Sequence, residues 1–247
     1  MSAASKETLR SGAALTALLL ISWQLLYWAI GEIALRSPAE TMLFTVKYVG
    51  TNVFWLHLTE TSKAFALALM LAAVIGLSLG FGLGLNRFSG EVLEPVLVAA
   101  YSVPKITLYP IILLMFGLGI SAKVAFGTIH GVVPIALLTI GAVRNVRPVF
   151  LKAAQTMHLS VRETIFSIVL PSALPEIITG LRMGFALTLI GTLLGEMFAS
   201  QRGLGFLLMN AIGLHNIDVI MAITVLLTLF AGSVSTVLLL LNRRIQK

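Results

Sequence analysis

The sequence contains no cysteine among its 247 residues. Without cysteine a chain forms no disulfide and offers no thiolate to a metal, so disulfide-stapled folds and cysteine-based zinc sites are excluded. The four histidines lie far apart in the sequence, and none pairs with another at the i, i+4 spacing of a helix face. We therefore predict no metal site.

Charged residues are also scarce, at 11% of the chain, whereas hydrophobic residues make up 58% and the mean hydropathy is +1.00. Such a composition is typical of membrane proteins, so the lipid bilayer is an expected partner. The formal net charge is +7, but most lysines and arginines lie between or beside apolar runs rather than along one face. No nucleic acid is therefore expected to bind.

The chain lacks a phosphate-binding loop. Gly80, Gly82 and Gly84 lie inside an apolar run that no Gly-Lys-Ser/Thr follows, so any ATP must be bound by another chain. Paired carboxylates such as Glu91 and Glu94, and sets of Ser, His and Asp, are scattered over loops and spans. No enzyme is predicted, because these residues share no pocket that the sequence indicates.

The chain instead contains apolar runs that are long enough to cross a bilayer. We predict an all-α membrane protein with about six transmembrane helices in one domain, residues 1–247. The predicted spans are residues 12–31, 64–85, 100–119, 123–142, 177–197 and 218–241. In the second span Gly76, Gly80 and Gly84 fall on one face, a pattern that allows a neighbouring helix to approach closely.

Basic residues are distributed unequally between the two sides of these spans. One side holds ten: Lys6, Arg10, Arg87, Arg144, Arg147, Lys152, Arg162, Arg243, Arg244 and Lys247. The other side holds five: Arg36, Lys47, Lys63, Lys123 and Arg202. Because cytoplasmic loops retain an excess of Lys and Arg, the bias predicts that both termini are cytoplasmic.

Two prolines and a lysine lie at the start of the third span. Pro104 and Pro110 are expected to bend it, and such a break is tolerated only where neighbouring helices or a cavity take up the freed carbonyls. The bend therefore either faces a translocation path or packs as a kink. Lys105 either extends its ammonium to the near membrane surface or faces an anionic substrate, since a charge at the bilayer centre costs about 2.5–3.5 kcal/mol.

Residues 143–176 form the longest hydrophilic interruption of the chain, and their basic character predicts a cytoplasmic loop. Pro148 suits the first position of a helix. Ser160 and Glu163 have the spacing of a capping box, in which each side chain satisfies a backbone N–H of a new helix. Pro171 and Pro175 are expected to end this second helix. We predict two short helices with a turn between them.

The spacing of this loop is Ala153-Ala154, then His158, then Ile168-x-Leu170-Pro171. It resembles the EAA loop of the inner-membrane permease subunits of ABC importers, whose pattern is Glu-Ala-Ala, three residues, Gly, nine residues, Ile-x-Leu-Pro. The continuation LPSALPEIITGLRMGFALTLIGTLLGEMFASQRGLG and the earlier VPKITLYPIILLMFGLG are most similar to the branch that serves nitrate, sulfonate, taurine and pyrimidine-precursor importers. The resemblance covers roughly residues 60–241.

Two residues depart from the family pattern. Lys152 stands where the family usually has Glu, and His158 stands where it usually has Gly. Glycine is favoured where the backbone turns through positive φ, and histidine adopts that conformation at some cost in strain. Either the turn is tighter, or the groove that the loop enters differs from the usual one. A degenerate loop in a poorly coupled subunit is the alternative.

The resemblance implies the type I ABC importer permease fold in the bacterial inner membrane. Two permease subunits, expected as a homodimer, would form the pathway for a small anion or a vitamin precursor. Two cytoplasmic ATPase subunits, which carry ATP and Mg, would dock on the loop, and a periplasmic solute-binding protein would deliver the solute. This chain itself is expected to bind no cofactor.

The resemblance also implies the residues that act. Those expected to couple to the ATPase are Phe150, Lys152, Ala153, Ala154, Met157, His158, Ile165, Leu170 and Pro171. Those expected at the pathway or a gate are Pro104, Lys105, Pro110 and Glu196. Glu196 precedes the Gly-Leu-Gly at 203–205, as in the family branch, and either gates or caps that segment. An ion-gradient-driven transporter and a non-transporting scaffold subunit remain as alternative functions.

Overall fold

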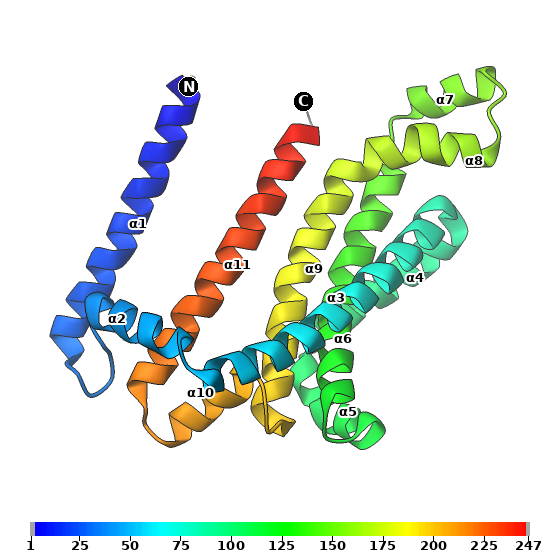
Figure 1. Cartoon of the computed structure of the whole chain (residues 1–247). Helices are drawn as coiled ribbons and strands as arrows, with labels where there is room; N and C mark the ends of the chain where they lie inside the picture. The colour runs from blue at the N-terminus through cyan, green and yellow to red at the C-terminus, as the bar shows by residue number, and fades with distance from the viewer. Residues whose placement is uncertain (1–2, 246–247) are drawn as a thin grey trace. The chain divides into compact units, whose positions relative to one another are not determined.

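The structure is a computed structural model that describes residues 3–245. Every regular element in that range is helical, so the predicted all-α class is confirmed (Figure 1). The α-helices are α1 (Ala3–Ile30), α2 (Pro38–Val49), α3 (Asn52–Leu85), α4 (Arg87–Ser102), α5 (Tyr109–Phe116), α6 (Ile120–Arg144), α7 (Pro148–Thr156), α8 (Val161–Thr164), α9 (Leu170–Ala199), α10 (Leu204–Gly213) and α11 (Ile217–Ile245). A 3₁₀ turn, η1 (Lys105–Leu108), precedes α5, and a π turn, η2 (Ile165–Val169), precedes α9.

Four described helices are long and apolar enough to cross a membrane, namely α3, α6, the continuous helix Val161–Phe198, and Ile217–Arg244. A fifth span results if α4 and the segment Lys105–Phe116 count as one bent span. The apolar part of α1, Ala14–Ile30, is shorter. Six spans are therefore reached only when α1 is added, and the first span remains a prediction.

The chain divides into two compact units. The first contains the residues up to Trp55 together with Leu207–Leu229. Within it Arg36 binds Asp218 with two hydrogen bonds, from Nε at 2.7 Å and from Nη2 at 3.4 Å. The indole N–H of Trp23 donates to the Arg36 carbonyl at 2.9 Å. These contacts connect α1 and the loop after it to the first turn of α11.

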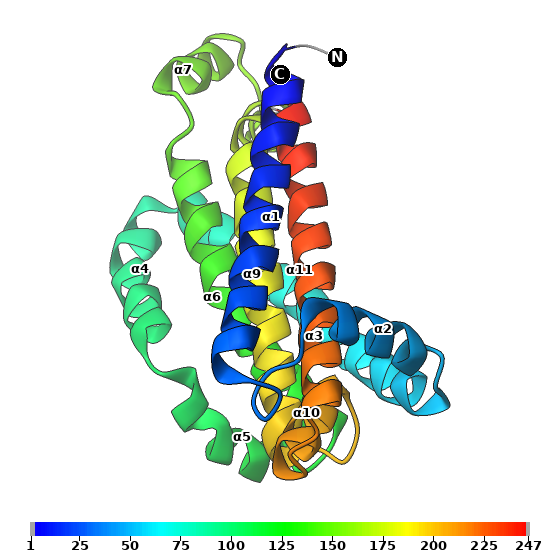
Figure 2. The same cartoon turned by 90° about the vertical axis from the view of Figure 1, so that its left-hand side faces the viewer.

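The second unit, Leu56–Phe206 with the residues from Phe230 on, is built around α6. A Cβ added to Gly80 of α3 would lie 2.4 Å from Cβ of Thr139. The α3 backbone at Gly80 therefore lies directly against the Thr139 side chain of α6. Gly76 and Gly84 contact α6 in the same way, and the predicted close approach is confirmed. α6 also packs along α9, as both views show (Figures 1 and 2).

The third predicted span is not one straight helix. The predicted range, residues 100–119, includes only the end of α4, whereas the possible span in the structure needs all of α4 together with Lys105–Phe116. These two helical parts meet at 88°, and Figure 2 shows the bend beside α6. Val103, which precedes Pro104, is extended, a conformation that the proline ring favours for the residue before it. Pro110 lies in the first turn of α5, where a missing N–H costs nothing.

Two expectations were wrong. Pro171 and Pro175 do not end the second loop helix, because the π turn at Ile165–Val169 carries it into α9. The Leu170 N–H donates to the Ile165 carbonyl, five residues back, and a proline is then accommodated in the next turn. Lys123, counted among the basic residues outside the spans, is instead buried in the first turn of α6, which begins at Ile120. Lys247, predicted to be cytoplasmic, lies outside the described residues.

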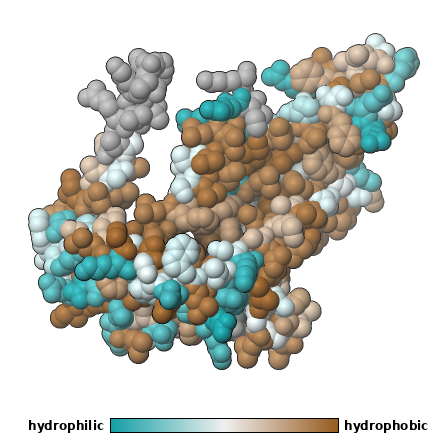
Figure 3. Space-filling view, in the orientation of Figure 1, coloured by the Kyte–Doolittle hydropathy of each residue, from teal (hydrophilic) through white to brown (hydrophobic). Residues whose placement is uncertain are grey.

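The surface of the second unit suits a bilayer. Large apolar side chains are exposed along α3 and α4, among them Met70, Val74, Val92 and Val96, each more than half exposed. Figure 3 shows a broad brown face over this unit, with teal side chains gathered at its α7 and α8 end. Exposure of so large an apolar face to water is unfavourable, so lipid or another protein is expected to cover it.

Candidate functional site

The hairpin of α7 and α8 carries six of the nine predicted coupling residues, from Phe150 to His158, and projects beyond the ends of α6 and α9 (Figure 1). Ile165 lies in η2, and Leu170 and Pro171 begin α9. His158 has φ of 53°, the left-handed conformation that the family's glycine position requires. Its N–H donates to the Gln155 carbonyl at 3.1 Å, and the Leu159 N–H donates to the Ala154 carbonyl at 3.0 Å. These two bonds form a Schellman motif, so α7 ends in the usual way with histidine at the glycine position.

The second half of the hairpin begins with the predicted capping box, which is confirmed. The Ser160 hydroxyl accepts from the Glu163 N–H at 3.3 Å, and the Glu163 carboxylate accepts from the Ser160 N–H at 2.8 Å. A cap of this kind satisfies two N–H groups at a helix start that would otherwise lack partners. The turn between the two helices is therefore held by hydrogen bonds on both sides.

The predicted coupling residues divide into an exposed and a buried set. Phe150 is 43% exposed and Met157 69%, whereas Ala154 is only 2% exposed. Lys152, Ala153, His158 and Pro171 are exposed, and Ile165 and Leu170 are partly buried. The hairpin also exposes apolar residues that were not assigned to coupling, namely Val149, Val161 and Phe166. It thus presents an apolar surface that no described part of the chain covers, whereas Ala154 packs inside the hairpin.

The base of the hairpin is fixed to the helices by an apolar core. Val146, Val169 and Ala173 are buried together there with Ala142 and Ile177. Partly buried residues from three further parts of the chain pack against them: Leu77 and Phe81 of α3, Leu151 of α7, and Ile168, Leu170 and Leu181. The hairpin is therefore packed together with α3, α6 and α9 into one body.

The bend between α4 and α5 holds Lys105. Its ammonium donates to the Tyr101 carbonyl at 3.1 Å and lies 4.7 Å from the centre of the Tyr101 ring. α4 has 16 residues, or about 24 Å at 1.5 Å per residue, so Lys105 lies far from the Asn86 loop. The carbonyls at a helix C-terminus lack helical partners and carry partial negative charge, which the lysine offsets here.

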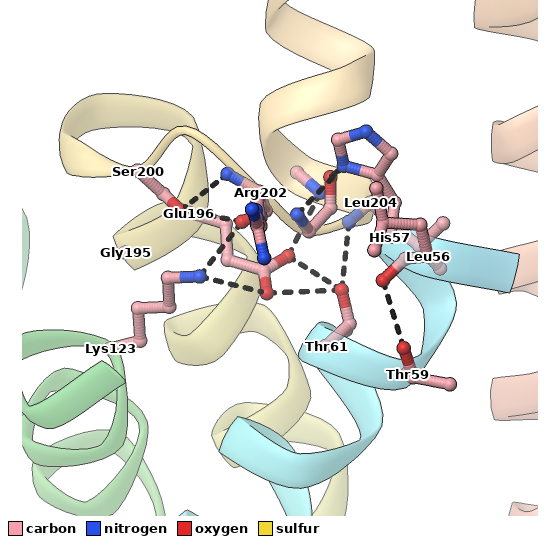
Figure 4. Close-up of polar contacts among 12 residues, drawn as sticks. Leu56, His57, Thr59, Thr61, Lys123, Gly195, Glu196, Ser200, Arg202 and Leu204 are labelled. Atoms are coloured by element: carbon pink, nitrogen blue, oxygen red, sulfur yellow. Dashed lines mark hydrogen bonds and ion pairs between the residues drawn. The ribbon is translucent and has the colours of Figure 1, made fainter. Parts of the chain in front are cut away.

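Glu196 of α9 is fully buried in a polar cluster (Figure 4). Its carboxylate accepts from the Thr61 hydroxyl of α3, at 3.0 Å to Oε1 and 2.8 Å to Oε2, and from the Gly205 N–H at 3.0 Å. Lys123 of α6, 3% exposed, lies 3.8 Å from Oε1 and donates to the Arg202 carbonyl at 2.8 Å. One carboxylate thus connects α3, α6 and α9 to the start of α10.

The loop before α10 gives its backbone donors to this cluster. The Gly203 N–H donates to His57 Nδ1 at 2.9 Å, and the Leu204 N–H donates to the Thr61 hydroxyl at 2.7 Å. Gly203 has φ of 121°, and a Cβ there would lie 2.2 Å from Cδ of Glu196. Only glycine fits this position, because a side chain would meet both an unfavourable backbone angle and the carboxylate.

A cavity of about 580 Å³ opens beside this cluster. Its lining includes Glu60, Lys123, Ser200, Gln201 and Arg202, so it carries groups of both charge signs. Six of the predicted coupling residues lie in the hairpin and the other three in η2 and the first turn of α9. Pro104, Lys105 and Pro110 lie together in the bend, and Glu196 is in neither place. Sequence reasoning missed its partners. The i, i+4 spacing of two polar residues, His57 and Thr61, in an apolar helix was the available signal.

Three comparisons relate this geometry to known proteins. A family model described as "Binding-protein-dependent transport system inner membrane component" matches residues 72–247. The taurine transport system permease protein of Escherichia coli is 28% identical over 247 residues, covering 98% of this chain and 90% of that protein. The formylaminopyrimidine transport permease protein of Halalkalibacterium halodurans is 30% identical over 190 residues, covering 76% of each.

A solved structure shares the fold. The inward-facing methionine ABC transporter MetNI contains a chain that superposes with a TM-score of 0.67 at 19% identity, covering 76% of this chain and 94% of that one. At this identity the likeness concerns the fold alone. It agrees with the predicted type I importer permease architecture.

Proposed function

The chain belongs to the family of binding-protein-dependent transport system inner membrane components, and from this premise we infer how its parts work in an importer. It is a transmembrane permease subunit of the ABC importer class, and the predicted branch, with taurine and pyrimidine-precursor permeases, is confirmed. These relatives support this function and not the ion-gradient or scaffold alternatives. The partners, the solute and the roles of single residues are proposals.

We propose that two cytoplasmic ATPase subunits, which bind ATP and Mg, dock on the hairpin of α7 and α8. The observation that carries this proposal is the exposed apolar surface, with Met157 at 69% and Phe150 at 43%, on a hairpin that is packed rigidly at its base. Closure of the ATPases would push on this surface and move the packed helices as a body, as in other domain closures. Both termini would then be cytoplasmic, in the inner membrane.

The test is co-purification of the subunit with its ATPase from mild detergent. Met157→Asp places a charge on the docking surface, and burial of a methionine contributes about 1.5–3 kcal/mol, so association should weaken roughly tenfold or more. Gln155→Asp is the matched control, because Gln155 is an exposed polar residue of the same helix. Equal recovery of ATPase with both variants would contradict the docking surface. Ala154→Asp tests the hairpin fold instead, because Ala154 is buried.

We propose further that the solute is a small anion that passes the α4 and α5 bend near Lys105. The relative named for taurine suggests the class of solute, because taurine carries a sulfonate, and Lys105 at the bend is partly exposed. Lys105→Gln should reduce uptake of taurine or nitrate by the reconstituted importer, whereas Lys105→Arg should retain it. An unchanged rate and solute dependence in Lys105→Gln would remove Lys105 from the pathway.

The Glu196 cluster is proposed as a cap that fixes α10 and the loop before it, rather than as a gate. Its support is the set of three backbone N–H groups, from Gly203, Leu204 and Gly205, that donate to side chains of the cluster. A periplasmic binding protein would meet this end of the chain, and a second copy of the permease would complete the pathway. For Glu196→Gln, lost assembly would indicate the cap, and lost transport with intact assembly would indicate the gate.

A further inference from the structure

The packed body that carries the hairpin includes α3, α6 and α9 but not α4. Of the 16 residues of α4 only Gly90 is buried, and Glu94 and Leu97 on the same face are partly buried. The other side chains of α4 are exposed apart from that of Ser89, which is also partly buried. Within this chain, α4 therefore has little apolar packing that would make it move with the packed body.

A cavity of about 550 Å³ lies between the first turns of α4 and the base of the hairpin. Its lining contains Arg87 and Glu91 of α4, Val143 and Arg144 of α6, Leu151 of α7, and Val169. Apolar packing is therefore interrupted where α4 passes the hairpin. The contact that bridges the edge of this cavity is polar.

Arg144, the last residue of α6, makes this bridge. Its Nη1 donates to Oε2 of Glu94 at 2.5 Å, and the side chains of both residues are partly buried. The guanidinium also covers Gly90, where a Cβ would lie 1.9 Å from Nη2 and 2.3 Å from the Leu83 carbonyl oxygen. Gly90 and Glu94 are four residues apart, so one arginine occupies one face of α4 over a full turn.

We propose that Arg144 is a positioning residue that transmits movement of the hairpin to α4, and through α4 to the bend at Pro104 and Lys105. Arg144 lies four positions before Pro148, the first residue of α7, on the helix that the hairpin moves. Because the guanidinium is held by an ion pair and by contact with a glycine backbone, α4 follows α6 without the apolar packing that joins the other helices. This proposal rests on the proposed docking of an ATPase at the hairpin.

The absence of cysteine allows a direct test by paired spin labels. Val98→Cys on α4 and Ser172→Cys on α9, both at exposed positions, report the separation of α4 from the packed body. The labelled permease is reconstituted with its ATPase and studied without nucleotide and after trapping with ATP and vanadate. If α4 follows the body, the label distance stays narrow and unchanged between the two states.

Arg144→Gln should release α4, so that the distance becomes broad and changes on trapping by about 5 Å, the rise of one helical turn. The charge exchange Arg144→Glu with Glu94→Arg should restore part of the narrow distribution, which a general loss of stability would not. A label distance in Arg144→Gln that matches the parent in both states would overturn the proposal. Should Arg144→Gln fail to fold, Glu94→Gln gives the same test, because it removes the other partner of the ion pair and leaves Arg144 and Gly90 unchanged.

Association of the ATPase and its trapping by vanadate, measured in each sample, separate this proposal from the docking proposal. If ATPase binds and is trapped by vanadate while the distance in Arg144→Gln stays as in the parent, only the role of Arg144 fails. If no ATPase associates with the parent permease, the docking of the hairpin fails first, and Arg144 then has no movement to transmit.

Discussion

Gly203→Ala probes both the backbone angle and the burial of Glu196 in one substitution. Gly203 has φ of 121°, which L side chains rarely adopt. An added Cβ would lie 2.2 Å from Cδ and Oε1 of Glu196, whose side chain is fully buried and fixed by Thr61 and Gly205. The Gly203 N–H is also held by His57 at 2.9 Å, so the loop has little freedom to turn away.

The size of the effect follows from two costs. A residue other than glycine held in this backbone region costs about 1–3 kcal/mol. An extra methyl group forced into a closely packed site costs about 1–3 kcal/mol more. The free energy of unfolding should therefore fall by about 2–6 kcal/mol. For a chain of this length each kcal/mol lowers Tm by about 2–4 °C, so Tm should fall by at least about 4 °C.

Thermal unfolding of the purified protein in detergent measures this shift. Gly82→Ala is the matched control, because Gly82 is an exposed helical glycine with no atom within 4 Å of an added Cβ. Alanine at a helical position of this kind favours the helix by about 1 kcal/mol. If Gly203→Ala unfolds at the temperature of Gly82→Ala, the left-handed turn and its contact with a buried carboxylate are not features of the folded protein.

Three further substitutions test other contacts. Thr61→Val leaves the Leu204 N–H and the Glu196 carboxylate without a hydroxyl partner, so unfolding should be easier by about 1–3 kcal/mol, with Thr61→Ser near the parent. Gly80→Val should cost about 1–3 kcal/mol by forcing α3 from α6, and resistance to SDS equal to that of the parent would contradict the close approach. His158→Gly removes left-handed strain of about 1–2 kcal/mol, so proteolysis within the hairpin should slow; unchanged cleavage would argue against that turn.

The parts of the fold that the sequence predicted correctly depend on neighbours in the chain. The glycines at 76, 80 and 84 recur at one turn of a helix, and this spacing alone indicates a face for close approach. The capping box of Ser160 and Glu163 is likewise a relation between residues three apart. The prolines at 104 and 110 indicated a bend, because they remove N–H groups wherever the segment packs.

Of the parts that the sequence did not predict, one depends on contacts between distant segments and the other on a local change of helix type. Lys123 was counted among the basic residues outside the spans. In the structure its charge lies in the first turn of α6, where the Arg202 carbonyl and Glu196, more than 70 residues later, compensate it. The span that was expected to begin after Pro175 begins earlier, because a π turn changes the hydrogen-bond pattern ahead of Pro171. The partners of Lys123 lie far along the chain, and no residue pattern between Ile165 and Leu170 indicated the π turn.

Contacts between helices also indicate which part of the chain can move and which part is held. Gly80 meets Thr139 at a distance too short for a Cβ, and Gly184 of α9 meets Ile135 in the same way, so α3, α6 and α9 cannot slide past one another without a clash. Between α4 and α5 the backbone is instead extended at Val103 and Pro104, and the Thr107 N–H makes only a 3₁₀ bond there, to the Pro104 carbonyl. If the proposed ATPase docks on the hairpin, its push would be carried through the packed helices and taken up where the helical hydrogen bonds stop, at the bend that holds Lys105.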